Sequence, residues 1–130
     1  MRITHTWLLA AGVAAASACS DDNTSPTDGG NGAAAADNVV VGNDFFRSEQ
    51  NGSQDPAVDT VAAGGAVTWT WIGTGATSHS VRSEGPATFA SSSILAGEGQ
   101  TYSVTFDTPG TYQYDCEIHG DAMTGTVVVQ

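Results

Sequence analysis

The amino-acid sequence predicts an all-β fold, a β-sandwich of about seven short strands, in residues 37–130. Three observations support this prediction. Polar and apolar residues alternate with a period of two over short segments, turn residues such as Gly and Pro separate these segments, and no segment of useful length has helical periodicity. A small antiparallel barrel would give a similar pattern, but an antiparallel sandwich is the preferred prediction.

The first half of this region contains three predicted strands. Residues 38–41 form a short apolar run, and residues 57–61 are followed by a Gly-rich turn. Residues 66–72 form the clearest strand, because threonines separate its large apolar residues. Three of these side chains share one face, which we expect to lie in the core: Val67, Trp69 and Trp71.

The second half contains four predicted strands. Residues 78–81 follow a stretch of Gly, Thr and Ser, and residues 102–106 alternate aromatic or valine residues with Ser and Thr. Thr108-Pro109-Gly110 predicts a turn, so we expect residues 111–116 to return as the hairpin partner of residues 102–106. Residues 124–130 complete the predicted fold.

The charge balance excludes two kinds of interaction. The chain has 14 Asp+Glu against 3 Lys+Arg, and its formal net charge is -11. A nucleic-acid partner requires a basic surface, and so does attachment to anionic lipids by charge alone. We therefore expect no nucleic-acid partner. The hydrophobic content of 40% is too high for a disordered acidic tail and indicates a folded domain.

Residues 1–18 have the features of an export signal. Arg2 supplies a short positive region, and the apolar run that begins at Trp7 is too short for a permanent membrane span. Small residues precede Cys19, and two cleavage routes fit this arrangement. Ordinary signal cleavage would give a secreted protein. The preferred prediction is a lipoprotein signal, in which Cys19 is acylated and becomes the mature N-terminus.

Residues 19–36 contain no large apolar side chain and are predicted to be a flexible linker. The chain is thus expected to consist of a signal peptide, a linker that begins with the lipidated Cys19, and a folded domain at residues 37–130. This organisation predicts a periplasmic or cell-envelope protein that contacts the membrane only through its N-terminal lipid.

Four residues of the predicted domain carry soft side chains that bind metals. Cys116, His119 and Met123 lie close together in the sequence, and His79 lies upstream on or beside another strand. Two imidazoles, one thiolate and one thioether form the ligand set of blue-copper electron-transfer sites. The sequence therefore predicts one copper ion bound by these four residues.

Taken singly, these residues also fit roles without copper. A buried Cys116 is an ordinary small core residue, and Met123 alone fills a core as often as it binds a metal. A structural zinc site would prefer more thiolates or histidines. A disulfide between Cys19 and Cys116 would consume the only thiol of the predicted core in a bond to the N-terminal tail. Copper binding is preferred because every soft ligand of the domain falls into one pattern.

Residues 37–130 resemble the cupredoxins of the plastocyanin/azurin-like copper-binding family. The segments that carry the resemblance are Val67-Thr68-Trp69, His79-Ser80-Val81, Thr108-Pro109-Gly110-Thr111-Tyr112, Cys116-x-x-His119 and Met123-x-Gly125-x-Val127-x-Val129. The resemblance implies a Greek-key sandwich of about eight strands. It also implies that copper lies at one end of the sandwich, with His119 as the solvent-side exit for the electron.

The sequence departs from the family pattern at three places. The loop between His119 and Met123 differs in length from the common family loops. Ser80 stands where an Asn often connects the two ligand-bearing loops, and a serine hydroxyl can make the same connection more weakly. Asp115 stands where plastocyanins carry a surface tyrosine.

The preferred function is a blue-copper carrier that cycles between Cu(II) and Cu(I) outside the cytoplasm. The alternatives are a periplasmic copper-binding protein for copper handling or delivery, and a metal-free scaffold. The residues indicate no open coordination position or general base, so no enzyme is predicted. We expect a monomer. Because Asp115, Glu117 and Asp121 surround the ligand loop, we also expect a redox partner with a basic docking surface, such as a cytochrome.

Overall fold

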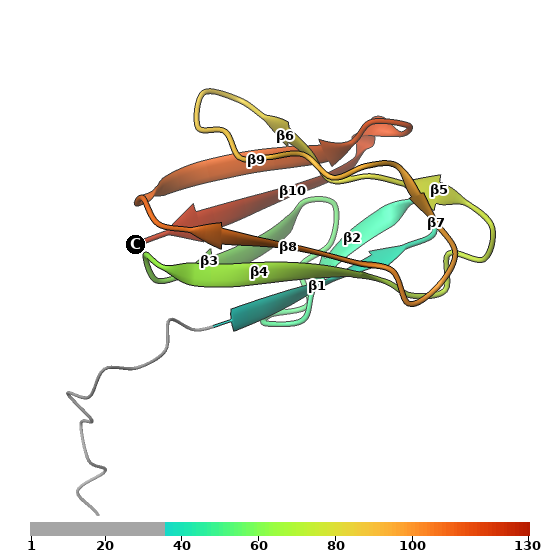
Figure 1. The fold of residues 1–130 in the computed structure, drawn as a ribbon, viewed down its shortest axis with the longest axis horizontal. Coiled ribbons are helices and arrows are strands. Elements are labelled where there is room, and N and C mark those ends of the chain that lie inside the picture. The colour runs from blue at the N-terminus through green and yellow to red at the C-terminus, as the bar shows by residue number, and fades with distance from the viewer. Residues whose placement is uncertain (1–35) are drawn as a thin grey trace, which may run out of the picture.

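The computed structural model describes residues 36–130, which form a β-sandwich of two four-stranded sheets and one short two-stranded sheet (Figure 1). The strands of the first sheet are, in spatial order, β2 (Phe45–Ser48), β1 (Ala36–Gly42), β4 (Gly65–Trp71) and β8 (Thr101–Phe106). Those of the second sheet are β3 (Ala57–Val61), β10 (Gly120–Val129), β9 (Gly110–Cys116) and β6 (Arg82–Glu84). The short sheet pairs β5 (Ser78–His79) with β7 (Leu95–Ala96).

The all-β sandwich predicted from the sequence is confirmed, but three details of that prediction are wrong. The described residues form ten strands, because the short strands β2, β6 and β7 were not expected. The sheets are mixed, since β1 pairs in parallel with β4 and β3 in parallel with β10. Alternation of polar and apolar residues shows which residues share a face, but it does not show which strand lies beside which.

The third wrong detail is the expected hairpin between residues 102–106 and 111–116. Strand β8 pairs with β4, whereas β9 pairs with β6 and β10, so the intervening turn crosses from one sheet to the other. The rings of Phe106 and Tyr112 meet across this crossing with their centroids 4.9 Å apart. The Tyr112 hydroxyl donates a hydrogen bond to the carbonyl of Thr108 and so stabilises the turn.

The core between the sheets is aromatic, and it contains Trp69 and Trp71 as the sequence predicts. Trp69 and Trp71 are fully buried, and the ring of Tyr114 from the second sheet packs edge-on against Trp69 at 5.2 Å. Phe46 contacts the same tyrosine ring at 5.0 Å. Edge-to-face pairs of this kind stabilise a core beyond the area that they bury.

One end of the sandwich gathers segments that are distant in the sequence. The C-terminal end of β9, the start of β10 and the short strand β5 lie at this end, opposite the C-terminus of the chain (Figure 1). The turn between β1 and β2 lies here too, because Asp44 of that turn contacts His119.

The N-terminal predictions fall largely outside the described residues. The export signal, Cys19 and the linker up to residue 35 are not described, and β1 begins at Ala36, one residue before the expected start of the domain. Residues 36–130 contain no helix of the length and apolar character needed to cross a membrane.

Candidate metal centre

Three of the four predicted ligands lie together at this end of the sandwich. The ligand atoms of His79, Cys116 and His119 all lie within 4.8 Å of one another. His79 is the last residue of β5, Cys116 is the last residue of β9, and His119 directly precedes β10. The fold thus brings a histidine from one segment to a Cys-x-x-His pair about forty residues later in the chain.

His79 and Cys116 form the buried part of the cluster. Both residues are 0% exposed, and Nδ1 of His79 lies 3.9 Å from Sγ of Cys116. Burial lowers the pKa of His79, and the nearby His119 lowers it further, while Asp44 opposes both effects. The His79 ring is therefore neutral at neutral pH, the state in which an imidazole nitrogen can bind a metal.

His119 supplies the second imidazole. Its ring lies 4.9 Å from the His79 ring, measured between centroids. Its Nδ1 is buried and has no hydrogen-bond partner among the described residues, whereas its Nε2 lies 3.0 Å from Oδ1 of Asp44. An unpartnered buried nitrogen next to a second imidazole and a thiol fits a metal ligand, because a buried polar atom without a partner is otherwise unfavourable.

A tight turn sets the position of His119 relative to Cys116. The His119 backbone N–H donates to the Cys116 carbonyl at 3.1 Å, and the Ala122 N–H donates to the His119 carbonyl at 3.3 Å. Gly120 follows with a φ of +54°, in the left-handed region that glycine adopts without strain. These contacts turn the chain back over the end of β9 within three residues.

Met123, the fourth predicted ligand, lies in the core beside the cluster. It is 0% exposed and belongs to the same buried group as Cys116. The last strand was expected to begin at residue 124, but β10 already begins at Gly120 and its pairing with β9 shifts register between Gly120 and Thr124. This bulge places Met123 on the buried face of β10, together with Gly125.

Ser80 connects the two ligand-bearing segments, as the sequence suggests for a serine at this position. The backbone N–H of Glu117 donates to Oγ of Ser80 at 3.0 Å, and Ser80 is buried. Since Ser80 follows His79 and Glu117 follows Cys116, this hydrogen bond connects the segment that carries His79 to the segment that carries Cys116.

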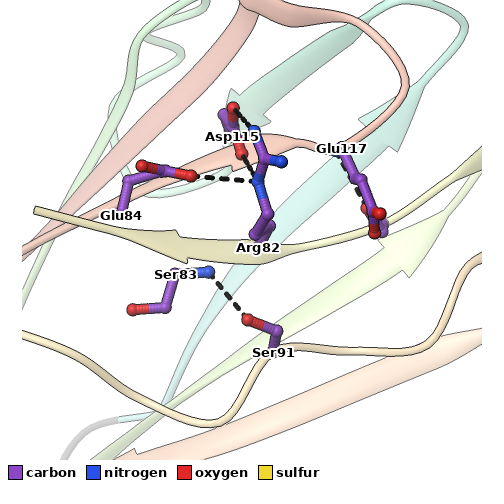
Figure 2. Close-up of polar contacts among 7 residues, drawn as sticks. Arg82, Ser83, Glu84, Ser91, Asp115 and Glu117 are labelled. Atoms are coloured by element: carbon purple, nitrogen blue, oxygen red, sulfur yellow. Dashed lines mark hydrogen bonds and ion pairs between the residues drawn. The ribbon is translucent and has the colours of Figure 1, made fainter.

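Asp115 is not a free surface charge. The Arg82 guanidinium binds both of its carboxylate oxygens, with Nε at 2.9 Å and Nη2 at 2.6 Å, and Nε of Arg82 also lies 2.9 Å from Glu84 (Figure 2). Asp115 is buried against this pair. Of the three acidic residues expected around the ligand loop, only Glu117 and Asp121 remain exposed and free of this ion pair.

One residue at the centre is not among those that the sequence indicates. Asp44 lies in the turn between β1 and β2, far from the other residues in the sequence, and contacts His119. The Asn43-Asp44 pair between two apolar segments is a recognisable hairpin signal. Nothing in the sequence, however, places that hairpin next to the ligand loop.

The donor set as a whole fits copper. Two imidazoles and a thiol in a closely spaced, largely buried cluster, with a thioether in the adjacent core, match the ligand preferences of a blue-copper site. A closed zinc site would need a fourth strong ligand, and the described residues offer only three within the cluster.

Comparison with known proteins agrees with this chemistry. A family model described as copper binding proteins, plastocyanin/azurin family, matches residues 19–130. The chain is 35% identical over 85 residues to plastocyanin from Scenedesmus fuscus, covering 58% of this chain and 85% of that protein. It is 43% identical over 79 residues to amicyanin-alpha from Methylorubrum extorquens, covering 59% of this chain and 63% of that protein.

A solved structure shows the same architecture. The oxidized plastocyanin of Dryopteris crassirhizoma superposes with a TM-score of 0.54 at 27% identity, covering 72% of this chain and 99% of that one. The chain therefore belongs to the plastocyanin/azurin family of copper-binding proteins, and it is a blue-copper electron-transfer protein whose cofactor is one copper ion.

Proposed function

We propose that His79, Cys116 and His119 bind the copper ion, with Met123 as a fourth and weaker ligand. The observation that carries this assignment is the spacing of the three strong ligand atoms, all within 4.8 Å of one another. The burial of Met123 in the same core supports its place in the set.

The bound copper would supply one-electron chemistry by cycling between Cu(II) and Cu(I). The chain's own residues keep the geometry constant during this cycle. Strand β9 holds Cys116, β5 holds His79, and the Ser80–Glu117 hydrogen bond fixes the distance between their segments. Full burial of His79 and Cys116 excludes water from that side, which suits an electron carrier.

His119 forms the proposed route to a partner. Its side chain is 23% exposed, in contrast to the fully buried His79 and Cys116, so an electron can leave through its ring. The neighbouring Ile118 is 49% exposed and Glu117 is exposed as well. A partner that docks over this loop comes close to the copper ligands.

The proposed partner has a basic docking surface, as a cytochrome can have. Glu117, Asp121 and Asp44 are exposed around the ligand end, while the charge of Asp115 is already neutralised by Arg82. Complementary charges of this kind mainly raise the rate of encounter.

We further propose export of the chain and attachment to the cell envelope through an acylated Cys19, with a monomeric domain beyond the linker. The sequence pattern of residues 1–19 supports this proposal. Mass analysis of the mature N-terminus tests it, since a lipid adds a defined mass to a chain that begins at Cys19.

The copper-site assignment predicts an intense visible band. Cu(II) added to the metal-free protein should produce a blue thiolate-to-copper absorption that bleaches on reduction and returns on oxidation. Cys116→Ser should abolish this colour, because it removes the thiolate donor. Met123→Leu, which conserves volume, should keep the colour and change the reduction potential.

Three outcomes would contradict the assignment. A blue band that survives in Cys116→Ser would show that another residue is the sulfur ligand. Colourless binding of Cu(I) alone would favour copper handling over electron transfer, and the absence of copper binding would favour a metal-free scaffold.

A further inference from the structure

The carboxylate of Asp44 lies against the outer nitrogen of a proposed copper ligand. Oδ1 of Asp44 is 3.0 Å from Nε2 of His119, and the two side chains are 59% and 23% exposed. The other imidazole differs, because Nε2 of His79 is buried without a hydrogen-bond partner among the described residues. Within residues 36–130, Nε2 of His119 therefore has a carboxylate partner, whereas Nε2 of His79 has no partner.

The fold holds Asp44 in place by a short hairpin. Gly42 pairs with Phe45, so Asn43 and Asp44 alone form the turn between β1 and β2. Asp44 adopts a φ of 66°, in the left-handed region that Asp enters more readily than most residues. Strand β1 is an inner strand, paired to both β2 and β4, and the adjoining Phe46 is fully buried. The carboxylate thus projects from an anchored element.

This contact determines which nitrogen of His119 is available to a metal. A carboxylate accepts hydrogen bonds, so a neutral His119 that donates Nε2–H to Asp44 has its free lone pair on Nδ1. Nδ1 is the buried nitrogen that has no other partner among the described residues. A carboxylate on the outer nitrogen also makes an imidazole a stronger donor to its metal.

We propose that Asp44 is a positioning residue that orients His119 with Nδ1 toward Cys116 and, through its charge, favours the Cu(II) state. This proposal rests on the copper site proposed above. It assigns the turn between β1 and β2 a role in setting the reduction potential, although Asp44 itself does not contact the metal.

Two substitutions separate the hydrogen bond from the charge. Asp44→Asn keeps an acceptor oxygen and removes the charge, whereas Asp44→Gly removes both and fits the left-handed backbone without strain. Asp107→Asn removes one charge from the exposed connection between β8 and β9, toward the opposite end of the sandwich, and serves as the control (Figure 1).

The measurements on the full chain are the reduction potential, the rate of Cu(II) loss to a chelator, and the His119 tautomer by ¹⁵N NMR in metal-free protein. Asp44→Asn should raise the potential and keep the Nε2–H tautomer. Asp44→Gly should raise the potential, mix the tautomers and weaken copper binding by about tenfold or more. Asp107→Asn should change none of the three by a comparable amount.

The proposal is overturned if Asp44→Gly matches Asp107→Asn in potential and in tautomer while the blue colour is retained. In that case the copper site stands and the role of Asp44 fails. If the wild-type protein instead forms no blue site, the proposed function fails. The contact between Asp44 and His119 is tested independently in metal-free protein, where a His119 tautomer that does not respond to Asp44→Gly refutes it.

Discussion

Asp59 is a carboxyl group enclosed in the core of the sandwich. It is 0% exposed in β3, and neither of its oxygens has a hydrogen-bond partner among the described residues. Burial raises the pKa of Asp59 to about 6, and the nearby Asp37 adds to this increase, while Ser48 opposes it. The folded protein therefore keeps the proton on Asp59 to a higher pH than the unfolded chain does, since ionisation places an unpaired charge in the core.

The raised pKa predicts that stability falls between about pH 4 and pH 6. The folded pKa lies above the unfolded value, so the contribution of Asp59 is fully present below the unfolded pKa and is lost as the pH rises through about 6. The loss is about 3 kcal/mol, from two pKa units. Asp59→Asn should remove this slope and stabilise the protein at pH 7, as measured by urea unfolding at several pH values. If stability falls with pH as steeply in Asp59→Asn as in the control Asp107→Asn, the assignment to Asp59 is refuted.

At the scale of the elements, one hydrogen bond joins the segments that carry His79 and Cys116. The segment after β5 carries Ser80, and its hydroxyl accepts the backbone N–H of Glu117 in the loop after β9. These segments come from different sheets, and the residues are separated by 37 positions. The bond therefore holds together two segments that are distant in the sequence.

Ser80→Ala is expected to destabilise the folded protein by about 1–3 kcal/mol, because the N–H of Glu117 would lose its acceptor in a partly buried site. It should also speed copper loss to a chelator, since the spacing of His79 and Cys116 is no longer fixed. Ser103→Ala is the matched control, because its hydroxyl bonds to Thr68 on an exposed surface. Equal effects of the two substitutions on unfolding and on copper loss would contradict this role of Ser80.

At the scale of the whole molecule, the net charge is strongly negative, but not every carboxylate near the site is free to attract a partner. The chain carries a formal net charge of -11, yet Asp115 next to the site is neutralised by Arg82. The exposed carboxylates of the ligand loop are those of Glu117 and Asp121. Long-range attraction raises the encounter rate with a basic partner and weakens as salt screens it.

We predict that the rate constant of electron transfer to a basic cytochrome falls as the ionic strength rises. The double substitution Glu117→Gln with Asp121→Asn should flatten this dependence and raise the potential. The control, Glu49→Gln with Asp107→Asn, removes two exposed charges outside the ligand loop. Stopped-flow measurements at several salt concentrations compare the two. Identical salt dependence in both variants would refute the docking surface, as would an Asp121→Asn variant unchanged in both salt dependence and potential.

Much of the fold and of the candidate site could be predicted from local patterns. The alternation around Trp69 and Trp71 identified the buried face of β4. The types of the four soft side chains indicated copper before any geometry was known. The strand that pairs with residues 102–106 could not be predicted, because the turn at Pro109 joins strands of different sheets.

The sequence by itself determined the all-β class, the buried faces and the donor chemistry, because strand periodicity and ligand type are properties of a residue and its near neighbours. Only the tertiary structure decided the parallel pairing of β1 with β4, the neutralisation of Asp115 by Arg82 and the contact of Asp44 with His119. Each of these depends on how distant segments pack into two sheets. Asp44 and His119 meet because the turn between β1 and β2 in the first sheet and the loop between β9 and β10 in the second sheet lie at the same end of the sandwich.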